Sequence, residues 1–185
     1  MEVYRCLRFP MQIERVDETQ LTPSDDALIN TLLKRSFGGG FGNRSFHQQR
    51  HTLRLLLRQD KMVIGHMALC YRAVRLGDIL HNIMGLAEVA SDPDFRGQGV
   101  ASRLMTAAIA EAKATQAAFF LLFGDQPLYA NSGFRAASNP ITHVDYDQAR
   151  TGSVHQAVRD QLMVLPLHNT PWDDTATLDL LGHKF

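Results

Sequence analysis

Cysteine is scarce in this chain of 185 residues, which contains two, Cys6 and Cys70. Two cysteines cannot build the disulfide framework of a small secreted domain, so we expect free thiols and a cytoplasmic location. Long apolar runs are also absent, as is a leader in which a charged stretch precedes an apolar one. The sequence therefore predicts neither a membrane span nor a secretion signal.

An excess of charge of either sign is missing as well. The chain has 19 basic and 19 acidic residues, and its formal net charge is zero. Without a basic surplus or a Lys/Arg block, we expect no nucleic-acid partner and no membrane-surface partner. Apolar residues make up 45% of the chain, which is ordinary for a globular protein, and the length favours a single domain over residues 1–185.

The most informative segment present is residues 91–102, in which an aspartate–proline turn leads into a glycine-containing loop. An apolar run ends just before this turn, and from Val100 onward apolar residues recur on one face of a helix. A strand, a glycine loop and a helix N-terminus in this order form an arrangement that can bind an anion. Glycines let the backbone approach the ligand, and the first N–H groups of a helix are unpaired. The segment therefore predicts a loop that binds a phosphorylated ligand.

Three kinds of phosphate loop compete for this segment. A nucleoside-triphosphate loop needs Lys-Ser or Lys-Thr after its last glycine, where this chain has Val100-Ala101. A dinucleotide fingerprint is a near match, with Gly97-x-Gly99-x-x-Ser102 and Asp125 as the ribose-binding acid. That fingerprint normally follows the first strand of its domain, whereas about half of this chain precedes the loop. A dinucleotide-dependent oxidoreductase is thus a minor alternative.

The third kind of loop matches best. The segment Arg96-Gly97-Gln98-Gly99-Val100-Ala101 resembles the (Gln/Arg)-x-x-Gly-x-(Gly/Ala) loop of the GNAT superfamily of acyl-CoA-dependent N-acyltransferases. The context agrees as well. The turn Asp92-Pro93 precedes the loop, an apolar strand follows its helix at residues 118–123, and Tyr129 stands shortly before Gly133-Phe134.

This resemblance implies an α/β (α+β) fold, with a mixed, mostly antiparallel central sheet and helices on both faces. The patterning agrees, because residues 52–58, 62–75 and 79–90 predict three strands joined by short polar turns. The other expected elements are an edge strand at 3–9, a helix capped by Ser24, and strands at 135–137 and 161–167. Residues 145–160 are ambiguous, and a helix within a long insertion is one interpretation.

The resemblance also implies acetyl-CoA as co-substrate, without a metal. The backbone of residues 96–101 would hold the pyrophosphate, because an N–H group that binds an ionised phosphate makes a charge-assisted hydrogen bond. Val89, Ala90 and Ser91 would offer main-chain groups to the pantetheine arm and an N–H group to the thioester oxygen. Arg96 has an alternative role as a solvated charge beside two aspartates.

The reaction implied by the resemblance is attack of an amine on the thioester. Tyr129 matches the family tyrosine that protonates the departing sulfur, because a phenol with a pKa of about 10 is protonated at neutral pH. A packing role for this tyrosine is the alternative. Glu88 is the candidate base, acting directly or through water, because an acid in an apolar strand needs solvent or a partner. Asp125 and His81 are alternative bases.

The position of Glu88 raises a question of direction. Relatives often carry this glutamate one residue earlier, where this chain has Ala87. A shift of one residue turns a side chain to the other face of a regular strand, and a β-bulge restores the direction. The offset therefore leaves open an alternative function, a non-catalytic acyl-CoA-binding module.

For the acceptor we expect the primary amine of a small molecule, attacking directly in a ternary complex. The candidate contacts are Phe41, Asp125 and Phe185. The C-terminal part is weakly similar to aminoglycoside 2′-N-acetyltransferases. Phe185 matches the terminal aromatic residue of those enzymes, but His183 stands where they have an acid. The family resemblance is compatible with a homodimer. His47 and His51 lack a third ligand at metal-site spacing, so no metal is expected.

Overall fold

The computed structural model describes residues 11–39, 41–147, 150–157 and 161–185, and the edge strand expected at residues 3–9 lies outside them. The strands of the described part are β1 (Gln12–Asp17), β2 (Leu53–Gln59), β3 (Met62–Leu76), β4 (Ile79–Ser91), β5 (Phe119–Phe123), β6 (Arg135–Ala136), β7 (Ile141–Asp147), β8 (Arg150–Ala157), β9 (Leu162–Pro166) and β10 (Leu178–Asp179). The α-helices are α1 (Pro23–Phe37), α2 (Val100–Lys113) and α3 (Pro127–Asn131), and η1 (Glu18–Gln20) and η2 (Pro93–Phe95) are short 3₁₀ helices.

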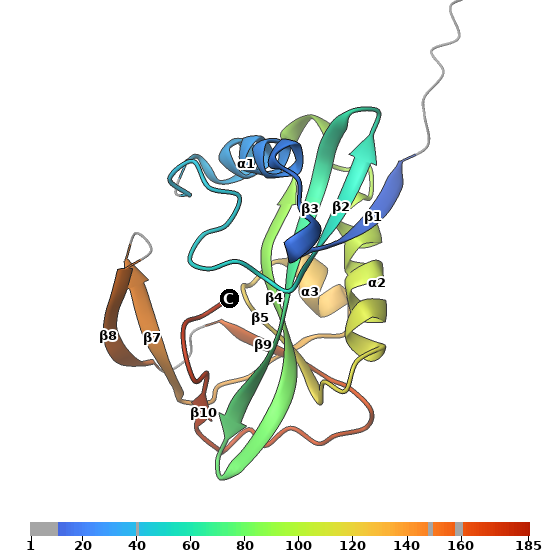
Figure 1. Ribbon diagram of the computed structural model, residues 1–185. Coiled ribbons are helices and arrows are strands. Elements are labelled where there is room, and N and C mark those ends of the chain that lie inside the picture. Colours follow the sequence, from blue (N-terminus) through green and yellow to red (C-terminus); the bar gives the residue numbers. More distant parts are fainter. Residues whose placement is uncertain (1–10, 40, 148–149, 158–160) are drawn as a thin grey trace, which may run out of the picture.

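These strands form one curled sheet in the order β6-β9-β5-β4-β3-β10-β7-β8, with β2 and then β1 attached to β3 (Figure 1). Among the described strands, two pairs are parallel, β4 with β5 and β10 with β7, and the others are antiparallel. The predicted meander corresponds to β2, β3 and β4. Because β3 is long, it pairs with β2 near its start and with β10 at its end.

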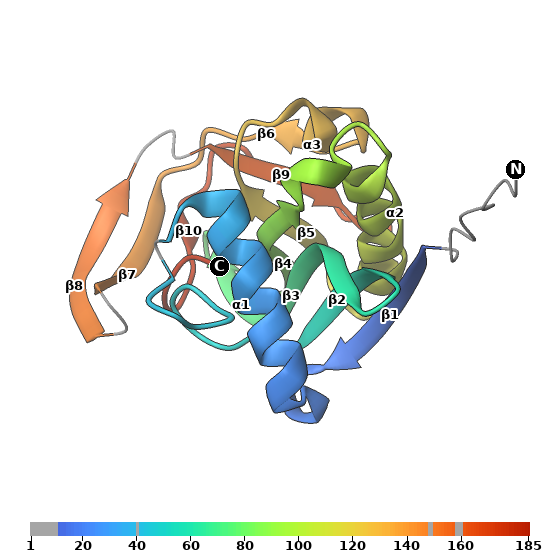
Figure 2. The ribbon, with the colours of Figure 1, turned by 90° about the horizontal axis from the view of Figure 1, so that it is seen from above.

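Helices α1 and α2 pack on opposite faces of this sheet (Figures 1 and 2). Successive residues of β2 show the arrangement, since Leu56 packs with α1 whereas Leu55 and Leu57 pack with α2. A strand covered on both faces reads as a continuous apolar run, which explains the Leu-rich sequence of β2. The predicted mixed sheet with helices on both faces is confirmed.

Helix α1 begins two residues earlier than the sequence predicts. Its N-cap is Thr22, whose side chain accepts a hydrogen bond from the Asp25 N–H, while the Asp25 carboxylate accepts one from the Thr22 N–H. Pro23 then occupies the first helical position, which suits its fixed φ and missing N–H group. The assignment of Ser24 as the cap was therefore wrong, because this capping box places the start at Thr22.

The helix considered for residues 145–160 is also wrong. Strands β7 and β8 instead form an antiparallel hairpin, which stands apart from the rest of the sheet in Figure 1. The side chains of β8 are exposed along nearly the whole strand. A hairpin that buries so few side chains needs no alternation of apolar and polar residues, so its sequence carries little strand signal.

Strands β4 and β5 pair in parallel from Ile83–Phe119 to Leu86–Leu122, and β4 then continues to Ser91 without β5. The two strands therefore separate beyond Leu86. Helix η2 and the glycine loop connect the end of β4 to α2. In the part of the chain that the structure describes, no helix is both long and apolar enough to cross a membrane.

Candidate active site

The glycine loop before α2 has the backbone conformation that its sequence suggests. Gly97 and Gly99 both have a φ of +76°, in the left-handed region that favours glycine. Gly99 is the N-cap of α2 and supplies no side chain to the N–H groups of the first turn. Those N–H groups and the positive end of the helix dipole therefore remain available to an anion.

The two aspartates before this loop bind to α1 and not to Arg96. Arg35 lies 3.0 Å from the Asp92 carboxylate and 2.8 Å from that of Asp94. Asp92 also accepts a hydrogen bond from the Asp94 N–H and so caps η2. Arg96 itself is exposed beside the loop. These contacts connect the end of β4 to α1 and position the start of the loop.

A β-bulge in β4 determines where Glu88 points. His66 pairs with Ala90 and Ala68 pairs with Ala87, so β4 has one residue more than β3 in this interval. Glu88 is at the bulge and has a φ of +52°, which is strained for a residue with a side chain. The bulge turns the Glu88 side chain toward the face that carries α1, which answers the question left by the offset from Ala87.

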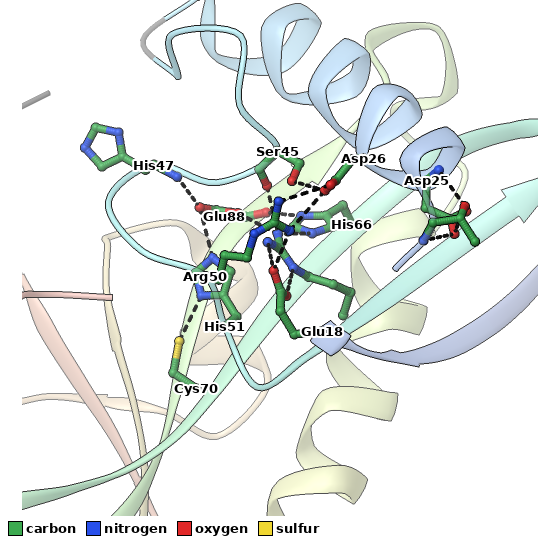
Figure 3. Close-up of polar contacts among 12 residues, drawn as sticks. Glu18, Asp25, Asp26, Ser45, His47, Arg50, His51, His66, Cys70 and Glu88 are labelled. Atoms are coloured by element: carbon green, nitrogen blue, oxygen red, sulfur yellow. Dashed lines mark hydrogen bonds and ion pairs between the residues drawn. The ribbon is translucent and has the colours of Figure 1, made fainter. Parts of the chain in front are cut away.

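The Glu88 carboxylate is almost completely buried, with 5% of its side chain exposed, and lies among hydrogen-bond donors (Figure 3). Its Oε1 accepts a hydrogen bond of 2.6 Å from the His47 backbone N–H and lies 3.0 Å from His51 Nε2. Its Oε2 accepts a hydrogen bond of 3.0 Å from Arg54 Nη1. Burial raises the pKa of Glu88, but His51 and the Arg54 charge outweigh it and hold this pKa below its ordinary value.

Arg54 is fully buried at the centre of this cluster. Its Nε and Nη2 donate to the two oxygens of Glu18, at 2.6 and 3.0 Å, and its Nη1 also donates to the Ser45 carbonyl. His66 lies between Arg54 and Glu88. Its Nε2 is 3.0 Å from Arg54 Nη1, and its Nδ1 is 2.9 Å from the Glu88 backbone carbonyl oxygen. Burial and the Arg54 charge lower the pKa of His66 to about 3. The ring is therefore neutral, and this network assigns its proton to Nδ1.

His51 joins Glu88 to Cys70. Its Nδ1 lies 3.0 Å from the Cys70 sulfur, and its Nε2 forms the ion pair with Glu88 without the alignment of a hydrogen bond. Burial lowers the pKa of His51, but Cys70 and Glu88 outweigh it and raise this pKa to about 9. The imidazole is thus charged at neutral pH.

The pair His47 and His51 forms no metal site. The His47 ring packs edge-on against Phe41 and points away from the Glu88 cluster (Figure 3). Among the residues that the structure describes, no group of three or more His, Cys, Asp or Glu side chains is arranged to hold a metal ion.

Tyr129 lies on α3 and is 7% exposed. Burial, and secondarily the charge of Asp125, raise the pKa of its hydroxyl above the ordinary value. The phenol is therefore protonated at neutral pH and can donate a proton.

Glu88 and Tyr129 line one cavity of about 360 Å³ at the place where β4 and β5 separate. The end of α1, the loop after it and the C-terminal residues contribute the other walls, and the chain end lies beside β4 (Figure 2). Val89, Phe41 and Phe185 also line this cavity. Of the predicted site residues, the structure therefore brings together the proposed acid, the proposed base, one cofactor contact and two acceptor contacts.

Other candidates lie elsewhere. Asp125 lines a separate cavity, where its carboxylate is within 3.4 Å of the Gln161 side-chain amide. His81 packs edge-on against Phe119, away from the Glu88 cavity. Ala90 and Ser91 follow Val89 on the end of β4 that β5 does not reach, where both residues pair with β3.

The sequence analysis missed His51 and Arg54 as parts of the site. A signal for Arg54 was available, because an arginine inside the apolar run of β2 needs a partner for the same reason that Glu88 does. His51 offered no comparable pattern, since it follows a loop and its partners come from β3 and β4.

Comparison with known proteins agrees with this arrangement. The family model described as "Acetyltransferase (GNAT) domain" matches residues 20–137. The Escherichia coli K12 protein named uncharacterized N-acetyltransferase YhbS is 31% identical over 122 residues, which cover 63% of this chain and 72% of that protein. The chain therefore belongs to the GNAT family of acetyltransferases, and the predicted enzyme class, an N-acetyltransferase, is confirmed.

Solved structures share the fold. The crystal structure of Escherichia coli YhbS in complex with CoA aligns with a TM-score of 0.62 at 21% identity, covering 97% of this chain and 93% of that one. A GNAT family acetyltransferase from Brucella melitensis in complex with acetyl-CoA aligns with a TM-score of 0.59 at 19% identity, covering 90% and 94%.

Proposed function

We propose that this protein transfers the acetyl group of acetyl-CoA to a primary amine of a small molecule, by direct attack in a ternary complex. The observation that carries the proposal is the single cavity lined by an ionised carboxylate, Glu88, and a protonated phenol, Tyr129. The two solved relatives contain CoA or acetyl-CoA, which supports the same co-substrate here.

The cofactor would lie along the end of β4 beyond Leu86, on the edge that β5 leaves open. The N–H groups of residues 96–101 would bind its pyrophosphate, because they precede or begin α2 and the loop glycines carry no side chains. The main chain of Val89, Ala90 and Ser91 would bind the pantetheine arm. The thioester would then enter the cavity between β4 and β5.

Tyr129 would donate its proton to the departing sulfur, since its raised pKa keeps the phenol protonated. Glu88 would accept the amine proton through a water molecule. Three donors already surround its carboxylate, and its lowered pKa makes it a weak direct base. In this role Arg54 and His51 are positioning residues.

The same observation also favours the second candidate function, an acyl-CoA-binding module without turnover. A carboxylate held by Arg54, His51 and the His47 N–H has little basicity left for an amine. Slow hydrolysis of acetyl-CoA that no amine accelerates would identify this module.

The first test is thermal unfolding with saturating acetyl-CoA, and with NADPH and ATP in parallel. A ligand at about 100 times its Kd adds about 2.7 kcal/mol of stability, which for a chain of this length corresponds to a Tm increase of roughly 5–10 °C. We expect this increase with acetyl-CoA alone. An increase with NADPH alone would contradict the cofactor assignment.

A further inference from the structure

Aromatic side chains are concentrated in the Glu88 cavity. Five of its sixteen lining residues are Phe or Tyr, although aromatic residues make up 8% of the chain. They are Phe37, Phe41, Phe123, Tyr129 and Phe185. A wall with so many rings favours a ligand that makes stacked or edge-to-face contacts.

Four of these rings form two pairs from different parts of the fold. Phe37, at the end of α1, lies 5.4 Å from Phe41, centroid to centroid. Phe123, at the end of β5, lies 5.4 Å from Phe185 at the chain end. Rings supplied by both the N-terminal and the C-terminal part of the chain therefore surround the same space.

The position of Phe185 is held by specific contacts. Arg72 donates hydrogen bonds to the carbonyls of Leu180 and His183, at 2.8 and 2.6 Å, and its guanidinium lies 5.3 Å from the Phe185 ring centroid. The ring also fills the space beside Gly85, where a Cβ atom would lie 2.7 Å from it. A glycine on β4 and a half-buried arginine on β3 thus fix the Phe185 ring against the sheet.

The walls of the cavity offer one carboxylate side chain to an ammonium group, and Lys184, which also lines the cavity, adds a positive charge. Among its described lining residues, Glu88 is the one acidic side chain, and it already forms ion pairs with Arg54 and His51. His183 is neutral at pH 7, because burial and the Arg72 charge lower its pKa to about 4, so it adds neither a positive nor a negative charge. A polycation would find no further carboxylate side chain on these walls.

From this lining we propose that the acceptor is a monoamine carried on an aromatic body, whose ring packs among Phe37, Phe41, Phe123 and Phe185 while its amine faces Glu88. This inference rests on the proposed function and names the substrate class of that site. The volume, about 360 Å³, lies at the lower end of small-molecule pockets.

Three amines with the same carbon chain test the proposal: 4-phenylbutylamine, n-butylamine and 1,4-diaminobutane. They end in a phenyl ring, a methyl group and a second ammonium. We expect kcat/KM, measured from CoA release, to be about tenfold or more higher for 4-phenylbutylamine, since burying its phenyl ring stabilises the bound amine. Equal or higher values for either of the other amines, or for a lysine-containing peptide, would overturn the inference.

The variant Phe185→Ala adds a test at the residue itself. We expect it to raise KM for 4-phenylbutylamine about tenfold and to leave KM for n-butylamine nearly unchanged. Tyr71→Ala, which truncates an exposed aromatic residue on β3 outside the cavity, is the matched control and should change neither value. An equal effect of Phe185→Ala on both amines would contradict an aromatic contact.

A binding measurement separates this inference from the proposed function. With CoA bound, 4-phenylbutylamine should raise Tm in the wild type and not in Phe185→Ala. If acetyl-CoA produces no shift, the proposed function fails. If CoA binds and the aromatic amine gives neither a shift nor turnover, the aromatic acceptor is wrong while the cofactor assignment stands.

Discussion

Glu88 has a positive φ and a buried carboxylate, two features that each cost free energy. The cost of burial is offset by Arg54, which in turn is neutralised by Glu18 on η1. A residue kept in a strained conformation within such a cluster is typical of functional sites. At the scale of single residues, the chemistry therefore depends on groups whose pKa values are set by their neighbours.

Tyr129→Phe tests the proposed acid. Phenylalanine keeps the packing of the ring and removes the proton, so we expect kcat to fall about 10²-fold or more, within the range for lost acid–base catalysis. The affinity for acetyl-CoA should be unchanged by thermal shift. Unaltered turnover in this variant would leave Tyr129 with a packing role only.

Glu88→Gln tests the proposed base. The pKa of Glu88 lies below its ordinary value, so the carboxylate is ionised at pH 5 and above. Protonation of Glu88 therefore lowers kcat/KM only at lower pH. We expect kcat/KM of Glu88→Gln to be about 10²-fold lower from pH 5 to 9. Asp174→Asn, which changes an exposed carboxylate in the other cavity, is the control and should match the wild type. Equal profiles for Glu88→Gln and wild type would exclude Glu88.

At the scale of elements, the site forms where one strand continues beyond its neighbour. Strand β4 leaves β5 after Leu86, bulges at Glu88 and ends at the turn that leads into α2. One strand thus carries the proposed base and the main-chain groups proposed for the cofactor, and it leads into the glycine loop. Errors in predicting β7 and β8 did not affect this region, because the hairpin lies at the far side of β10.

Gly99→Ala tests the anion loop. The φ of +76° makes any side chain costly there, by about 1–2 kcal/mol, and the added methyl group would also lie at the N-terminus of α2. We expect the Kd for acetyl-CoA to rise about tenfold or more. Gly38→Ala is a close control, since Gly38 is the C-cap of α1 with a φ of 74° and likewise has no atom near its Cβ position. Similar Kd changes in both variants would point to general strain instead of a lost anion site.

At the scale of the molecule, the cluster around Arg54 connects η1, β2, β3, β4 and the loop after α1. Its buried histidines have opposite pKa shifts. Each ties the stability of the whole fold to pH, because a group whose pKa differs between folded and unfolded states binds or releases protons on unfolding.

We expect Tm to be highest near pH 6.5. His66 has a folded pKa of about 3, below 6.5, so its contribution is complete above pH 6.5 and is lost as the pH falls toward 3. His51 has a folded pKa of about 9, so its contribution is complete below pH 6.5 and is lost as the pH rises to 9. The lowered pKa values of Glu18 and Glu88 add to the loss below pH 4.5.

Thermal scans between pH 4 and 9.5 check this expectation. His51→Gln should flatten the alkaline side and His66→Gln the acidic side. His155→Gln, an exposed histidine on β8, is the control and should leave both sides in place. A Tm that rises steadily from pH 6.5 to 9 would contradict the charged state of His51.

The sequence by itself was sufficient to predict the family, the meander and the conformation of the glycine loop before α2. These features rest on neighbours along the chain: glycines at fixed spacing, an aspartate–proline turn, and apolar residues at the period of a strand or a helix. Such local patterns determine local backbone conformation, so Gly97, Gly99 and the start of α2 could be read directly from the order of residues.

Tertiary structure alone decided the direction of Glu88 and the composition of the cavity. The bulge depends on the register between β3 and β4, and the charge state of Glu88 depends on Arg54 and His51 from other elements. Phe185 reaches the cavity because Arg72 holds the chain end and Gly85 leaves space for the ring. Contacts between residues far apart in the chain form only when the core packs, and therefore no local pattern encodes them.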